Sequence, residues 1–292
     1  SNNRISASGI KSLIECMLGS KTVLRELNVS HNMLGREGGI SFARFIKEHK
    51  YIESLNLSFN HLDGFGAEEI GKALEVNKTI KSLNLSGNKD LNIDERREHR
   101  ESEESRTFLG LTELLKSLKS SAITSLDLSE RSCLNMKEDQ AEIFAEILKS
   151  KECSIVDLDL SSNQLSPETN IIFTSLKNNE SLEKLRIGFN FYGNQGCEAL
   201  CEILDDNSTL TYVDVRNNHF MGDDAGEMLS AAVMNNQRIS TFLLSGNDLP
   251  VEHVDQIERH LDTIRVTGES LTVQDVIFKF QNEEIFDGTL NA

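Results

Sequence analysis

The chain has 292 residues, with 30 lysines and arginines against 47 aspartates and glutamates, and its formal net charge is −17. Hydrophobic residues make up 38% of the sequence, which is enough for a buried core and excludes a wholly disordered chain. The acidity argues against a nucleic-acid partner, no apolar run approaches the roughly 20 residues of a membrane span, and no signal-peptide pattern opens the chain.

The cysteines indicate a reducing compartment. There are five, an odd number, and none forms a CxxC pair, so a disulfide framework is not expected. We therefore expect a cytoplasmic protein with free thiols.

A pattern of the form L-x-x-L-x-L-x-x-N recurs along the chain. The first copy, LRELNVSHN, occupies residues 24–32, and later copies begin at Ile52, Ile80, Ile155, Leu182, Leu210 and Ile239. A degraded copy at 123–131 ends in Arg131 instead of asparagine, and a fragment at 261–266 keeps only the apolar skeleton. Successive starts are 28, 28, 43, 32, 27, 28, 29 and 22 residues apart, which predicts a stacked array of about nine units.

Each unit is predicted to contain one strand and one helix. The alternation of Leu55 and Leu57 has the period of a half-buried strand, and the asparagine that closes the motif is suited to hydrogen-bonding a neighbouring turn. The apolar residues of GAEEIGKAL, at 66–74, have helical spacing. One such unit cannot bury both apolar faces alone, so stacking is required.

This chain resembles the ribonuclease-inhibitor-like class of leucine-rich repeat proteins. The resemblance rests on the strand motifs above and on helices such as GFGAEEI at 64–70 and GNQGCEAL at 193–200, and it covers about residues 3–266. It implies an α/β fold: a right-handed, horseshoe-shaped solenoid with parallel strands on the concave face and helices on the convex face. The class includes nuclease inhibitors, an activator of the GTPase Ran, actin cappers and immune sensors, so the fold leaves the function open.

Both ends of the chain depart from the repeat. Residues 1–6 align with residues 161–166, the back half of a strand motif, so we expect the array at 1–266 to begin within a repeat. Residues 267–292 lose the pattern but stay apolar enough to serve as a terminal cap.

A charged insertion at 89–106 accounts for the longest spacing between repeats. It carries seven acids and five bases with only two aliphatic residues, Leu91 and Ile93, so it cannot bury itself. It is interpreted as a tolerated surface loop, as a projecting segment that docks a partner, or as a regulatory segment with Ser102 and Ser105 as modifiable sites.

The concave face is the expected docking surface, and its composition changes along the array. The outward positions are small and polar in the first three repeats, become acidic in the middle, and then carry basic and aromatic residues. The predicted partner-binding residues are Asp127, Asp157, Asp159, Lys184, Arg186, Phe189, Tyr212, Asp214 and Arg216. Arginine beside aromatic residues is typical of interface hot spots. Alternatively, Asp157 and Asp159 pair with Lys184 and Arg186 across adjacent strands.

No catalytic motif is found. The sequence lacks GxxxxGK[ST], GxGxxG after a strand, and GxSxG, and no pair of its seven histidines has metal-ligand spacing. Cys197 and Cys201 lie one helical turn apart, but Cys197 takes the place of Ala67 in the repeat and is interpreted as a small core residue.

We therefore expect a non-enzymatic, monomeric interaction module without cofactor or metal. Its partner would be a protein with a basic or mixed-charge patch. The alternative functions are a GTPase-activating regulator that resembles the Ran activator, or an actin-capping, immune-sensor or microbial-effector domain.

Overall fold

The computed structural model describes residues 3–20, 23–88, 91, 109–130, 134, 136 and 138–267. Its described part contains one parallel sheet in which strand order follows chain order, from β1 to β8. The strands are β1 (Glu26–Asn28), β2 (Ser54–Asn56), β3 (Ser82–Asn84), β4 (Ser125–Asp127), β5 (Asp157–Asp159), β6 (Lys184–Arg186), β7 (Tyr212–Asp214) and β8 (Thr241–Leu243). The sheet is open, because every strand pairs only with its neighbours in the sequence.

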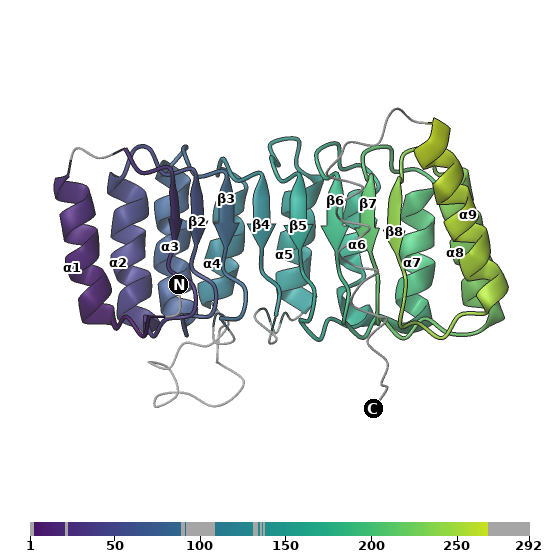
Figure 1. The fold of residues 1–292 in the computed structure, drawn as a ribbon, viewed down its shortest axis with the longest axis horizontal. Helices are drawn as coiled ribbons and strands as arrows, with labels where there is room; N and C mark the ends of the chain where they lie inside the picture. Colours follow the sequence, from purple (N-terminus) through teal and green to yellow (C-terminus); the bar gives the residue numbers. More distant parts are fainter. Residues whose placement is uncertain are drawn as a thin grey trace, which may run out of the picture.

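A helix follows every strand, and one more precedes β1. The helices are α1 (Ala7–Gly19), α2 (Gly35–Glu48), α3 (Gly64–Val76), α4 (Leu109–Leu118), α5 (Glu138–Lys149), α6 (Ile171–Leu176), α7 (Gly193–Leu204), α8 (Asp223–Asn235) and α9 (Val251–Thr267). Before α6 lies a short 3-10 turn, η3 (Pro167–Thr169). Figure 1 shows the helices in a longer row behind the strands, so the sheet lies on the inner side of the curve. The expected α/β leucine-rich repeat solenoid is confirmed.

The core lies between the sheet and the helices. The central residue of each strand points inward, and Leu55, Leu83 and Leu126 are in register and buried. The helices contribute residues spaced as predicted, with Ala67 and Ile70 fully buried in α3. Because this arrangement continues from repeat to repeat, the described part of the array shares one continuous core.

The motif asparagines form a ladder that links the turns after the strands. The Val29 carbonyl accepts hydrogen bonds from the Nδ2 atoms of both Asn32 (2.7 Å) and Asn60 (3.0 Å). The Asn60 Oδ1 accepts from the Asn32 backbone N–H at 3.1 Å. Asn60 is fully buried, so these bonds satisfy backbone groups that water does not reach. The predicted role of these asparagines is confirmed.

A second asparagine ladder joins the opposite ends of the helices, and the sequence reading missed it. Its members are buried and each donates from Nδ2 to a carbonyl of the preceding repeat: Asn77 to Ile46, Asn179 to Leu148, Asn207 to Leu176 and Asn236 to Leu204. Each stands three residues before the first apolar residue of its strand motif, and that spacing is the signal that could have revealed it.

The prediction of a last, incomplete strand motif at 261–266 is wrong. These residues belong to α9, in which Ile257 and Leu261 are buried. The reason is their spacing, because Val254, Ile257, Leu261 and Ile264 recur with the period of a helix and the closing asparagine is missing.

Two further predictions fall outside what the structure describes. Apart from Leu91, the insertion at 89–106 lies outside the described residues, and so does the proposed cap beyond Thr267. Both remain predictions. Within the described residues, no helix is long and apolar enough to cross a membrane.

Candidate functional site

The predicted partner-binding residues lie together on the concave face, from β4 to the turns after β6 and β7. Asp127 is in register with Asp159, Asp159 with Arg186, and Arg186 with Asp214. One position earlier on these strands, Asp157, Lys184 and Tyr212 form a parallel row. We call the nine predicted residues, including Phe189 and Arg216 after the strands, the concave strip.

Arg186 occupies the centre of the concave strip and makes contacts on both sides. Its guanidinium forms an ion pair with Asp157 on β5. On the other side it lies over the ring of Tyr212 on β7, 5.0 Å from the ring centroid. The cross-strand pairing that the sequence left open therefore exists, but it joins Arg186 to Asp157 diagonally and not to Asp159. The stacking on Tyr212 orients the basic group and the aromatic ring together.

Arg216 is held by Asp214. The two side chains form a bidentate pair, with Nε to Oδ1 at 2.9 Å and an N–H of Nη2 to Oδ2 at 2.6 Å. Asp214 is only 2% exposed, so it presents Arg216 to the surface and offers a partner little area of its own. Gly188 makes room for this pair, because a Cβ there would lie 3.1 Å from Asp214 Oδ1.

Asp127 and Asp159 lie side by side, and the nearest basic group, Arg186, acts on Asp159 only through its charge. Within the described residues neither forms an ion pair. Asp127 accepts hydrogen bonds from Asn84 Nδ2 at 2.6 Å and from the Ser129 hydroxyl at 2.7 Å. The pKa of Asp159 is raised chiefly by burial, with a further contribution from the charge of Asp127. The pair is thus a partly desolvated negative spot at the middle of the strip.

Phe189 and Lys184 provide the exposed side chains of the strip. Phe189 is 52% exposed and adopts a left-handed backbone conformation, with φ of 58°, directly before the ladder residue Asn190. Its N–H donates to the Arg216 carbonyl at 2.7 Å, which fixes the turn. Lys184 is exposed beside Tyr212. An exposed phenylalanine held on a fixed turn is a suitable apolar contact for a partner.

A neighbouring aromatic pair escaped the sequence reading. Phe191 is 54% exposed and stacks on His219 of the next repeat, with 5.4 Å between ring centroids. A similar stack joins His31 and Phe59 near the start of the array, at 4.4 Å. The sequence could have revealed both stacks, because the two residues of each stack occupy the same position in successive repeats and such positions lie next to each other in the array.

Cys197 and Cys201 are buried, as expected for core residues. A hydrogen bond with Cys197, together with burial, raises the pKa of the Cys201 thiol. Such a thiol is protonated at neutral pH and is a poor nucleophile or metal ligand.

Comparison with known proteins yields the same repeat. The family model described as Leucine Rich repeat matches residues 20–43, 48–71, 76–92 and 206–230. NACHT, LRR and PYD domains-containing protein 14 of Mus musculus is 28% identical over 159 residues, which are 53% of this chain and 16% of that protein. The matched region thus spans only a small part of that relative's length.

Two solved structures are similar in outline. Leiomodin-1 actin-binding site 2 superposes with a TM-score of 0.47 and 15% identity, covering 60% of this chain and 95% of that one. The tropomodulin C-terminal domain of Caenorhabditis elegans gives 0.41 and 13%, covering 45% and 79%. The matched repeat motifs, together with the ordered parallel sheet and its asparagine ladder, give this chain the architecture of a leucine-rich repeat solenoid.

Proposed function

We propose that the chain is a non-enzymatic protein-interaction module that holds a basic segment of a cytoplasmic protein partner against the concave strip. The observation that carries this proposal is the pair of Asp127 and Asp159. Two carboxylates in register on adjacent strands, neither of which forms an ion pair among the described residues, create a local negative potential that the neighbouring charge of Arg186 reduces only in part.

The surroundings of the pair support a cationic side chain as its ligand. A lysine or arginine of the partner would hydrogen-bond both carboxylates and offset the cost of burying Asp159, whose pKa is raised. Asp157, in contrast, is neutralised by Arg186, and its part would be to hold Arg186 over Tyr212. The negative spot therefore consists of Asp127 and Asp159, and Asp157, which the sequence also predicted to attract a basic partner, does not belong to it.

The apolar part of the interaction would come from the next two repeats. Phe189 offers an exposed ring at the edge of the strip. Tyr212 is held by Arg186, so its ring loses little conformational entropy on binding. We therefore expect a basic residue followed by an aliphatic or aromatic one in the bound segment. Lys184 and Arg216 border this region and would disfavour a second basic group there.

The test is selection from a random peptide library displayed on phage, with the whole chain as bait. Wild-type protein should enrich lysine- or arginine-containing peptides, and the double variant Asp127→Asn, Asp159→Asn should lose this enrichment. Asparagine occupies the equivalent positions in β1 to β3, so the variant retains a residue that the repeat accepts.

A control of equal charge separates a specific site from general acidity. Glu68→Gln with Glu69→Gln removes the same two charges from α3, on the convex side. Enrichment should survive in this variant. If both double variants lost it equally, or if wild-type protein enriched no basic peptides, the proposed site would be wrong.

A further inference from the structure

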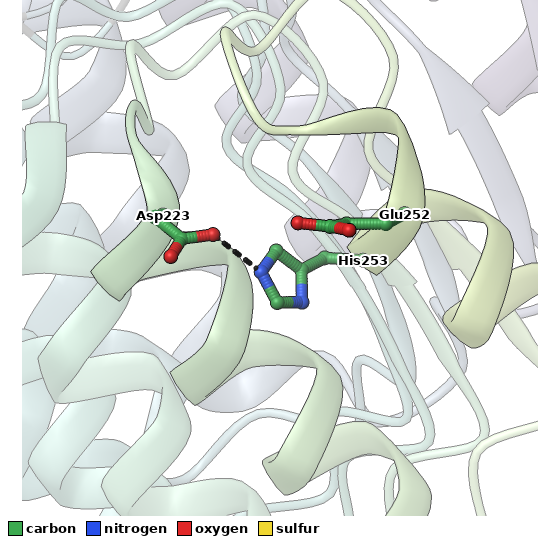
Figure 2. Close-up of side chains that lie close together, drawn as sticks. All are labelled: Asp223, Glu252 and His253. Carbon is green, nitrogen blue, oxygen red and sulfur yellow. Dashed lines mark hydrogen bonds and ion pairs between the residues drawn. The ribbon is translucent and has the colours of Figure 1, made fainter.

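The helices α8 and α9 meet at their first turns, in the last described repeat. Asp223 opens α8, and Glu252 and His253 lie in the first turn of α9. The Nε2 atom of His253 lies 2.8 Å from Oδ1 of Asp223. One donor atom from each of the three side chains lies within 4.8 Å of the other two. Figure 2 shows the Glu252 carboxylate directed into the same space as the other two groups.

The imidazole of His253 is held in place by packing. Its side chain is only 13% exposed and its ring lies against Gly226 of α8. A Cβ at Gly226 would come within 2.5 Å of the His253 Cδ2, so the glycine provides the seat for the ring. Asp223, in contrast, is 73% exposed in its side chain. The group thus combines one fixed nitrogen donor with two carboxylates that have room to adjust.

The charge of the group is not balanced. Asp223, Asp224 and Glu252 bring three carboxylates to the two first turns, and His253 is the basic group grouped with Asp223 and Glu252. Within the described residues, neither Asp223 nor Glu252 forms an ion pair with a lysine or arginine. A simple ion pair would need only Asp223 and His253, and the position of Glu252 leaves a negative charge beside it.

We propose that Asp223, Glu252 and His253 bind a divalent transition-metal ion, and that this ion fastens α9 to α8. One imidazole nitrogen and two carboxylate oxygens are a donor set that suits zinc, and water would complete a tetrahedral site. Calcium prefers six to eight oxygen ligands, which this group does not provide. The ion would displace the proton shared between His253 and Asp223, which is released to water, and its second positive charge would offset the negative charge of Glu252.

The movement required of His253 and Asp223 is small, and the Glu252 carboxylate, within 4.8 Å of both, must approach them. Zinc ligands lie at roughly 2.0–2.2 Å from the ion, so two of them are separated by roughly 3.3 Å in a tetrahedral site. The His253 Nε2 and Asp223 Oδ1 atoms, now 2.8 Å apart, must therefore open slightly. The exposed Asp223 side chain can do this by rotation while the His253 ring stays on Gly226.

The experiment titrates the whole chain, free of any histidine tag, with zinc chloride in a calorimeter, and repeats the titration with calcium chloride. Wild-type protein should bind one zinc ion, and its melting temperature should rise with zinc concentration. Calcium should produce neither effect. The same titrations on three variants distinguish the proposed site from adventitious binding.

Glu252→Gln leaves the His253–Asp223 pair intact and removes one ligand. Its melting temperature without metal should equal that of wild type, while its zinc affinity should fall by about tenfold or more. His253→Gln preserves a donor toward Asp223 but is a poor metal ligand, and it should abolish binding. His219→Gln removes an exposed histidine elsewhere and should bind as wild type.

The proposal is overturned if wild-type protein binds zinc no more tightly than His253→Gln does. It is equally overturned if Glu252→Gln retains wild-type affinity, because the glutamate would then be no ligand. Neither result would bear on the concave strip, which lies on other residues.

Discussion

The guanidinium of Arg186 lies between two strands' side chains, paired with Asp157 on one side and 5.0 Å from the ring centroid of Tyr212 on the other. The side chain of Arg186 on β6 thereby links β5 to β7 across the concave face. The contact is formed without any partner, so the centre of the strip is organised in advance of binding.

The stacking of Arg186 on Tyr212 should be measurable as a coupling energy. A double-mutant cycle with Arg186→Met and Tyr212→Leu, followed by urea unfolding, should give about 0.5–1 kcal/mol of favourable coupling. The control cycle combines Lys184→Met, instead of Arg186→Met, with Tyr212→Leu, because Lys184 is in register with Tyr212 but exposed. Equal coupling in both cycles would show that the stacking contributes nothing specific.

Replacing Asp159 by asparagine should stabilise the fold at neutral pH. Because burial raises the pKa of Asp159 above its ordinary value of 3.8, the folded chain binds this proton more readily than the unfolded chain does. Ionisation of Asp159 therefore opposes folding, and this cost grows as the pH rises from 3.8 through the higher folded-state pKa. The introduced asparagine would still accept the hydrogen bond that the Ser161 N–H donates to this position at 2.9 Å.

The measurement is urea unfolding of wild type and Asp159→Asn between about pH 4 and pH 7. The advantage of the variant should be full at neutral pH and shrink toward the acid end. Glu69→Gln, an equal charge change on the convex side, serves as the control. A variant that is less stable than wild type at pH 7 would contradict the assigned cost.

Asn60→Ala should cost about 2–4 kcal/mol of unfolding free energy. The substitution removes Nδ2 donors from the Val29 and Leu57 carbonyls, both at 3.0 Å, and leaves the Asn32 N–H without its side-chain acceptor. Asn194→Ala is the control, because its hydrogen bonds to Met221 lie at the exposed surface. Thermal and urea unfolding report both changes, and similar losses in the two variants would exclude a special role of the ladder.

Gly39→Ala should destabilise the protein although alanine favours helices by about 1 kcal/mol over glycine. A Cβ at Gly39 in α2 would lie 2.6 Å from the Gly66 Cα in α3, and backbone atoms cannot move aside as a flexible side chain can. We expect a net loss of roughly 1–3 kcal/mol. Gly19→Ala, with open space around it, should be neutral or slightly stabilising in the same unfolding assay.

The sequence by itself determined the repeat, its strand and helix content and the faces on which residues lie. These follow from local periodicity, because Leu55 and Leu57 must share a face wherever a strand forms and every repeat copies that choice. The same logic placed seven residues of the concave strip on adjacent strands, with Phe189 and Arg216 in the turns that follow β6 and β7. It failed at 261–266, where the apolar skeleton of a strand motif also fits a helix and the helical spacing of Val254, Ile257 and Leu261 continues through the segment.

Only the tertiary structure decided which partners those residues choose. Register places Arg186 opposite Asp159, yet its long side chain reaches diagonally to Asp157 and leaves Asp159 beside Asp127. Asp223 and His253 are 30 residues apart and meet because the array returns to the same position once per repeat. Spacing along the chain cannot fix such contacts, since side-chain reach, burial and the room left by residues such as Gly188 and Gly226 determine them.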